Sequence, residues 1–204
     1  MSAALSSFLP TVLRNAPACP DFTAEQAVLD AAIAFCAASR AWRLIDDHAL
    51  AEGWTGPIPI SLGEGQALHS IERAWFDGKQ LDPKPFSEYP QDGDIQGTPR
   101  CFSQTERGSL LVWGEGQAGA LRLSLFLKPA NGADTVPDFL FEDHREDIAA
   151  GALADLLMTP DVAWTDPNRA TFYGAKFKAA CDGAFAASIR GQQRAPARSR
   201  SRFV

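Results

Sequence analysis

The chain has 204 residues, 46% of them apolar and 22% charged, with a formal net charge of −6 at neutral pH. These values are ordinary for a soluble globular protein with a buried core, and they exclude a protein that binds polyanions through its overall charge. No apolar run reaches a membrane-spanning length, and the N-terminus lacks the charged and apolar regions of a signal peptide. We therefore expect one domain, or one domain with an inserted lobe.

Residues 1–20 are predicted to form an extended arm. Pro10, Pro17 and Pro20 prevent a continuous helix in this segment. Apolar residues lie between and before these prolines, among them Phe8 and Val12. A polar disordered tail would not carry such residues, so we expect the arm to pack against another surface.

A helix is predicted from Phe22 to about Leu44. Thr23 and Gln26 have the spacing of a capping box, with Asp21 as an alternative cap. Apolar residues then recur at helical spacing, and many of them are alanines. Small side chains of this kind permit a close approach of a second helix.

The middle of the chain changes to strand periodicity. Pro59 limits the first of these strands to the edge of a sheet, and Asp77-Gly78 is typical of a hairpin turn. A loop rich in Pro, Gly and Asp follows over residues 82–99. We expect a small antiparallel sheet or sandwich of about five strands, near residues 58–62, 69–76, 101–104, 109–113 and 120–128.

Two helices are predicted to close the chain. The first runs from Phe139 to Met158, with Asp138 as a possible cap. The second runs from Asn168 to about Gly191. It is preceded by a capping Asp166 and by Pro167 at the favoured first position.

The predicted fold class is α+β: an α-helical bundle of about three long helices with an inserted small antiparallel β lobe and extended N- and C-terminal arms. The corresponding boundaries are an arm over 1–20, a helical bundle over 21–50 and 135–191, a β lobe over 51–134, and a basic tail over 192–204.

The C-terminal segment differs most from the rest in charge. It holds five arginines and no acid, which leaves the remainder at about −11. Docking on a protein partner, contact with nucleic-acid phosphates and a solvated disordered tail are the three interpretations. We favour docking, because no aromatic residue lies among the arginines to stack on bases. The predicted docking residues are Arg190, Arg194, Arg198, Arg200, Arg202 and Phe203.

The chain carries no recognised catalytic motif, and we expect no enzyme activity, cofactor or metal. Glu64, Asp77, Asp92 and Asp94 are loop carboxylates that a cell-wall hydrolase would need in pairs. His144 lies in an acidic run, where a first helical turn explains it better than a metal site. The four cysteines are interpreted as buried or structural, although Cys101 with His69 and Asp94 could be assembled into a nucleophilic site on paper.

Several segments resemble the head-to-tail adaptor (connector) proteins of tailed phages, specifically the portal adaptors of the podovirus type. The resemblance spans most of the chain and is weakest in the middle sheet. It is carried by packing motifs rather than by catalytic ones: Leu9-Pro10-x-Val12-Leu13, Ala18-Cys19-Pro20, Ala31-Ala32-Ile33-x-Phe35-Cys36, Arg40-Ala41-Trp42-Arg43, Lys128-Pro129, Val136-Pro137-Asp138, Ile148-Ala149-x-Gly151-Ala152 and Trp164-x-Asp166-Pro167.

This resemblance implies a structural protein of the virion tail or neck, assembled in the host cytoplasm. Such adaptors form a ring, typically of twelve copies, beneath the portal protein. The C-terminal segment docks on the portal, and the β lobe faces a downstream tail or nozzle protein. Genomic DNA passes through the lumen without sequence-specific contact, and no membrane is involved. The alternatives are a tail-associated cell-wall hydrolase using loop carboxylates and a DNA-binding module acting through the tail.

Overall fold

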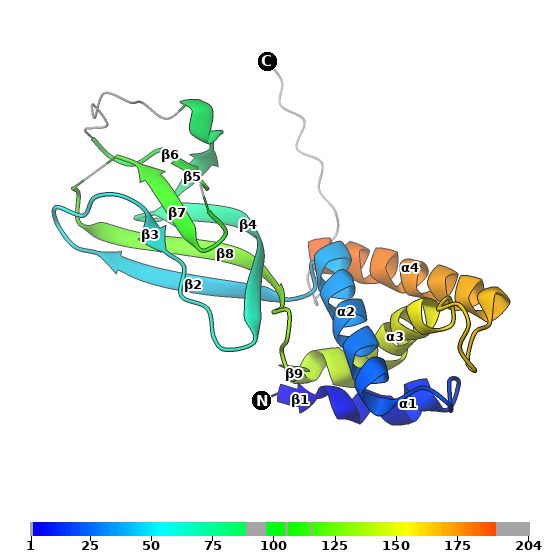
Figure 1. Cartoon of the computed structure of the whole chain (residues 1–204). Helices are drawn as coiled ribbons and strands as arrows, with labels where there is room; N and C mark the ends of the chain where they lie inside the picture. Colours follow the sequence, from blue (N-terminus) through cyan, green and yellow to red (C-terminus); the bar gives the residue numbers. More distant parts are fainter. Residues whose placement is uncertain (1, 89–96, 105, 115, 191–204) are drawn as a thin grey trace, which may run out of the picture. The chain divides into compact units, whose positions relative to one another are not determined.

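The computed structural model describes residues 2–88, 97–104, 106–114 and 116–190. These residues form two compact units (Figure 1). The helical unit combines Met1–Ala41 with Lys128–Val204, and the sheet unit is Trp42–Leu127. The helical unit is therefore built from two segments that are far apart in the sequence, with the whole sheet unit inserted between them.

The helical unit contains all four α-helices of the described residues. A two-stranded antiparallel sheet pairs the first residues of the chain with the segment that enters α3. The elements of the helical unit are β1 (Ser2–Ala4), the 3-10 helix η1 (Leu5–Phe8), α1 (Leu9–Leu13), α2 (Asp21–Ser39), β9 (Thr135–Pro137), α3 (Asp138–Leu156) and α4 (Pro167–Arg190).

The first twenty residues do not form an extended arm, so this part of the prediction is wrong. Phe8 is fully buried and meets the ring of Phe141 edge-on at 5.2 Å between centroids. Val12 and Ala16 are also fully buried. Pro10 is accommodated because it lies in the first turn of α1, where a helix needs no backbone N–H donor.

Helix α2 begins and ends earlier than the sequence predicted. Pro20 is its N-cap, with no side-chain capping bond, so the predicted capping box at Thr23 is not used. The helix ends at Ser39 because Arg40 adopts a left-handed conformation with φ 53°. The Arg40 N–H still donates to the Cys36 carbonyl at 3.0 Å, which closes the last turn. The chain then extends as a strand instead of continuing helical to Leu44.

The long helices meet at Gly151 of α3. A Cβ atom at this position would lie 2.8 Å from the Phe177 ring of α4 and 3.0 Å from the Cβ of Ala31 in α2. Both distances are shorter than ordinary van der Waals contact, so only glycine fits. The alanine-rich face of α2 and the missing side chain at Gly151 together set how closely these helices approach.

The sheet unit consists of one seven-stranded sheet of mixed direction. The strand order is β2-β8-β4-β5-β6-β7-β3. Strands β5 and β6 pair in parallel. The pairs β2–β8, β4–β5, β6–β7 and β3–β7 are antiparallel. The strands are β2 (Arg43–Leu50), β3 (Ile58–Pro59), β4 (Gln66–Phe76), β5 (Lys79–Pro83), β6 (Cys101–Ser103), β7 (Ser109–Trp113) and β8 (Gly119–Pro129), with a 3-10 turn η2 at Phe86–Glu88.

The predicted fold class is therefore wrong. The described residues form an α+β protein with four α-helices and a large curled sheet, not a bundle of about three long helices with a small antiparallel lobe and an extended N-terminal arm; the predicted C-terminal arm lies outside the described residues. The sheet is larger than predicted because β2 comes from sequence assigned to the first helix. It also includes β5 (Lys79–Pro83), which was not among the five predicted strands and whose last residues fall in the predicted loop.

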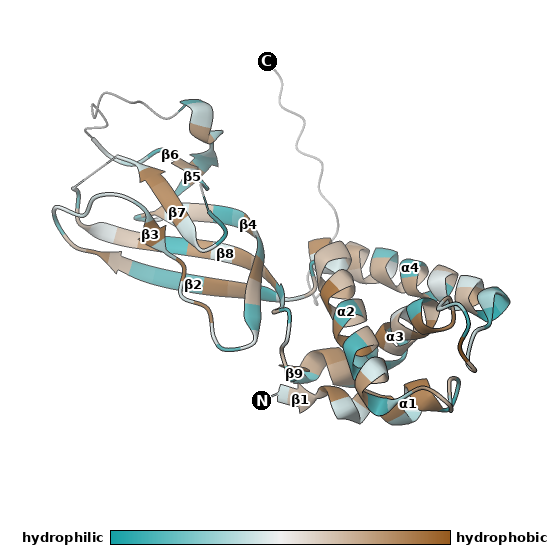
Figure 2. Ribbon diagram, viewed as in Figure 1, coloured by the Kyte–Doolittle hydropathy of each residue, from teal (hydrophilic) through white to brown (hydrophobic). Residues whose placement is uncertain are grey.

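Strand β8 supplies the centre of the sheet core. Leu121, Leu123, Leu125 and Leu127 are fully buried on one face, as their predicted alternation requires. Phe76, Leu81 and Leu110 from other strands join the same cluster. Figure 2 shows apolar residues along β7 and α2, which lie in the separate cores of the two units.

The start of α4 is as predicted. The Asp166 carboxylate accepts a hydrogen bond from the Arg169 N–H at 3.1 Å, and Pro167 occupies the first helical position. The Arg169 side chain in turn donates to the Asn15 side-chain oxygen at 2.8 Å. This contact joins the start of α4 to the segment that follows α1.

Replacing Gly151 by alanine is expected to destabilise the protein. The new methyl group must displace the Phe177 ring or separate α3 from α2, at a cost of about 1–3 kcal/mol that exceeds the roughly 1 kcal/mol gained in helix propensity. Urea unfolding of the variant and the wild type measures the difference. Gly183→Ala in α4 is the matched control, because nothing lies within 4 Å of its Cβ position, and it should stabilise. Equal effects of the two changes would contradict the close contact.

Candidate functional site

The predicted docking residues lie mostly outside the described residues. Arg190 is the last residue of α4, and it is exposed. Arg194, Arg198, Arg200, Arg202 and Phe203 belong to residues 191–204, which the structure does not describe. Helix α4 is therefore the described element that leads directly into the arginine-rich segment.

Helix α4 has an inner and an outer face, and large apolar residues lie on both. Ala170 and Cys181 are buried on the inner face, with Phe177 half-buried between them. Phe172 and Ile189 are each 65% exposed on the outside of the helix. We call the exposed side the outer face of α4; its exposed apolar and small residues are Phe172, Ala175, Ala179, Gly183, Ala186, Ala187 and Ile189.

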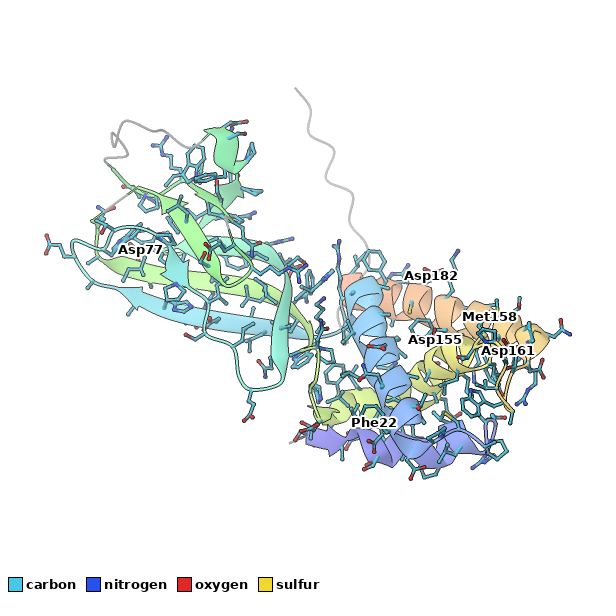
Figure 3. All side chains as sticks on the ribbon, viewed as in Figure 1. Phe22, Asp77, Asp155, Met158, Asp161 and Asp182 are labelled. Carbon is cyan, nitrogen blue, oxygen red and sulfur yellow. The ribbon has the colours of Figure 1, made fainter. Side chains whose placement is uncertain are left out.

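Other parts of the helical unit also expose large apolar side chains. Phe22 in the first turn of α2 is 78% exposed, and Met158 after α3 is 59% exposed (Figure 3). Single exposed apolar residues are common on protein surfaces. Exposed phenylalanines and a long apolar helix face in one unit are more typical of a protein that is covered by partners.

The acidic run that contains His144 begins in the second turn of α3. The His144 ring contacts the Phe35 ring in a tilted arrangement, 4.6 Å between centroids, and its Nδ1 lies 3.3 Å from an Asp147 carboxylate oxygen. The helix is kinked at His144, whose φ and ψ are −129° and 16°. Among the described residues, no three His, Cys, Asp or Glu side chains are arranged to hold a metal ion.

Of the four loop carboxylates, the structure describes Glu64 and Asp77, which lie at opposite ends of β4. Glu64 precedes β4 and Asp77 follows it, and β4 has eleven residues. At roughly 3.3 Å per residue the contour length of this bent strand is about 36 Å (Figure 1), whereas paired glycosidase carboxylates lie within about 10 Å of each other. Asp77 instead accepts a hydrogen bond from the Ala120 N–H at 2.8 Å. Asp92 and Asp94 lie outside the described residues.

The helical unit buries three of its cysteines. Burial raises the pKa of Cys36 to about 12, with a smaller contribution from the nearby Cys181. Burial, followed by Asp182 and Asp147, raises the pKa of Cys181 to about 11. Both thiols therefore stay protonated at neutral pH and pack as small apolar side chains. Cys101, which the sequence analysis considered as a nucleophile together with His69 and Asp94, is half-buried on β6.

Two ion pairs lie on the outer surface of the sheet, opposite its core. Arg122 on β8 donates two hydrogen bonds to Asp47 on β2, at 2.7 and 3.0 Å, and this lowers the pKa of Asp47. Arg43 on β2 binds Glu72 on β4 at 2.9 Å. The Glu72 carboxylate also accepts a hydrogen bond from the buried Ser124 hydroxyl at 2.7 Å.

An apolar hollow lies beside these ion pairs. Its volume is about 750 Å³, and its lining includes Ile45, Ala49, Trp75 and Ala120. Ile45 is 51% exposed between Arg43 and Asp47 on β2. The sequence analysis missed this surface because it placed the segment around Ile45 at the end of a helix. Residues 43–50 show no regular alternation of apolar and polar side chains, so the sequence carried no clear indication of a strand there.

No helix of the described residues is long and apolar enough to cross a membrane. No protein-family model matches the chain, and no curated protein is similar to it in sequence. The surfaces described above are thus the observations on which a function can be proposed.

The buried thiols predict a simple pattern of reactivity. In the native protein at pH 8, an aromatic disulfide reagent should react readily with Cys101 alone, and with all four cysteines after unfolding in guanidinium. Cys101→Ser should remove the fast reaction. Because the folded pKa of Cys36 lies above the ordinary 9.0, its contribution to stability is present below pH 9 and is lost as the pH rises towards 12. Rapid native labelling of Cys36 would contradict its burial.

Proposed function

We propose that this protein is the head-to-tail adaptor of a tailed phage. Its copies form a ring, with twelve as the expected number, that joins the portal protein to a downstream tail or nozzle protein. It acts as a structural part of the virion, at the tail or neck. The segment that follows α4 docks on the portal, and DNA passes through the ring without sequence-specific contact.

The outer face of α4 is the observation that carries this proposal. A 24-residue helix that buries only two of its residues is poorly covered within its own chain. Phe172 and Ile189 remain largely exposed near its two ends, with small residues between them. Packing of such a face against another helical surface removes apolar area from water. The same helix leads into the basic tail, so assembly contacts and portal docking would involve one continuous part of the chain.

The residues that carry the adaptor resemblance support the proposal through their places in the helical unit. Ala31 and Gly151 face each other where α2 meets α3. Phe35 is fully buried, and Asp166 caps α4. These motifs specify how the helices pack, which is what a structural protein must retain.

The charge distribution is suited to a DNA channel. The chain without its five C-terminal arginines carries a charge of about −11, which would repel DNA phosphates. A ring with an acidic lumen lets DNA slide without binding it. The C-terminal segment carries five arginines and no acid, and arginine pairs well with carboxylates on a protein partner.

The basic tail is expected to be required for portal binding. Deletion of residues 191–204 should leave the circular dichroism spectrum of the helices nearly unchanged and reduce capture by the purified portal ring at least about tenfold, because the arginine contacts are lost. Replacing Arg194, Arg198, Arg200 and Arg202 by glutamine should have a similar effect, whereas lysine should retain part of the binding. Full portal binding by the deletion variant would contradict tail docking.

If the C-terminal arginines are needed for binding DNA and not for binding the portal ring, the nucleic-acid interpretation is favoured. In that case the four-glutamine variant should lose DNA binding, and the wild-type affinity for DNA should fall steeply with salt concentration. Portal binding with little DNA binding at physiological salt is the expected result.

The outer face of α4 is expected to be needed for ring formation. Phe172→Lys places a charge on an apolar contact and should prevent a complete ring from forming on the portal in negative-stain electron micrographs. Since Phe172 is 65% exposed, the change should hardly alter the stability of the isolated chain. Lys178→Ala, on the same helix and also exposed but about 120° around the helix from Phe172, is the control that should leave the ring intact. Normal rings with Phe172→Lys would exclude this face as a subunit contact.

A further inference from the structure

Strand β2 is an open edge of the sheet. In the sheet order of the described residues its one neighbour is β8, and Figure 1 shows it running along one border of the sheet. It is eight residues long and contains no proline. The opposite edge, β3, has two residues and one of them is Pro59, which cannot donate to a further strand. The sheet therefore has one protected edge and one edge able to pair.

The alternation of hydrogen-bonded and non-hydrogen-bonded pairs between β2 and β8 shows which residues of β2 direct their backbone N–H and C=O groups towards the open edge. The Leu127 N–H donates to the Trp42 carbonyl at 2.8 Å, so this opposed pair is hydrogen-bonded. Bonded and non-bonded pairs alternate along an antiparallel ladder, so Leu44, Asp46, His48 and Leu50 bond to β8.

Ala120 gives an independent check on this phase. It lies opposite Ala49, yet its N–H and carbonyl are bonded to Asp77 on its other side. The pair of Ala49 with Ala120 is therefore not hydrogen-bonded. It follows that Arg43, Ile45, Asp47 and Ala49 direct their backbone groups away from β8, and the side chains of these four residues are also exposed.

These outward residues are self-complementary. In an antiparallel pairing of two β2 strands about Ile45, residue 45 meets residue 45 and Arg43 of each copy meets Asp47 of the other. The central pair is apolar, since Ile45 is 51% exposed, and both flanking pairs are of opposite charge. Within each copy Arg43 already binds Glu72 and Asp47 already binds Arg122. Charges of alternating sign would therefore run across the junction without a like-charged neighbour.

From this register we infer that two copies of the free protein form a symmetric dimer by pairing their β2 edges around Ile45. The pairing joins the two sheets into one continuous sheet, satisfies the open backbone groups of both edges and covers Ile45 of each copy. It is an isologous contact, which closes at two copies and cannot repeat around a ring. The inference concerns the protein before assembly and does not rest on the adaptor proposal.

The oligomeric state of the full-length protein tests the inference. Analytical ultracentrifugation without any partner should show a monomer–dimer equilibrium, and Ile45→Lys should raise the dissociation constant by about tenfold or more. Ile189→Lys is the matched control, because Ile189 is also an exposed isoleucine but lies in α4, and it should leave the dimer unchanged. A monomeric wild type, or equal effects of the two lysine variants, would overturn the inference.

A cysteine pair tests the register and does not depend on destabilising the dimer. In a hydrogen-bonded antiparallel pair the Cα atoms lie about 5.5 Å apart, which is within the range of a disulfide. Ile45→Cys should therefore form a disulfide-linked dimer under mild oxidation. Ala49→Cys is exposed on the same face of β2, but this register places it opposite residue 41, so it should cross-link far less. Efficient cross-linking of Ala49→Cys with none of Ile45→Cys would overturn the proposed pairing, and the wild type shows the background from native thiols.

Discussion

The close packing of α2, α3 and α4 at Gly151 is the constraint on which the helical unit depends. This unit is formed by two segments that are separated by the entire sheet unit. Contacts between α2 and α3 must therefore offset the loop entropy of closing that insertion. The absence of a side chain at Gly151 lets Ala31 and Phe177 reach the same point. The largest buried side chains, such as Phe35 and Leu153, then pack around a junction that no other residue would permit.

The sheet unit depends on a different constraint: one of its two edges is blocked to further pairing and the other is open. Pro59 and the shortness of β3 end the sheet on one side. On the other side β2 remains regular for eight residues, with its outward backbone groups unsatisfied by β8. Proteins usually protect such an edge with proline, bulges or charge. Here the charges of Arg43 and Asp47 are each neutralised within the chain, so they protect the edge poorly against a second copy.

Across both units, the features that suggest function are exposed surfaces and not enclosed sites. Of the candidate carboxylates, the two described ones, Glu64 and Asp77, lie at opposite ends of β4, and the buried thiols remain protonated. The outer face of α4 and the edge of β2 are instead apolar surfaces with charged residues nearby. A structural component of an assembly requires surfaces of this kind.

The sequence by itself determined the elements whose physics is local. The cap at Asp166 followed by Pro167 marks the start of α4, and the alternation from Leu121 to Leu127 marks a strand, because each depends on neighbouring residues alone; the burial of Ser124 and Phe126 on the other face of that strand comes from tertiary structure. The left-handed Arg40 that ends α2 has no glycine to mark it, so the helix was extended too far and β2 was missed. The helical conformation of the N-terminal segment and the pairing of β1 with β9 were decided only by tertiary structure, since they depend on partners distant in sequence. The exposure of Phe172 and Ile45 was decided in the same way, because periodicity identifies an apolar residue but not the surface that it faces.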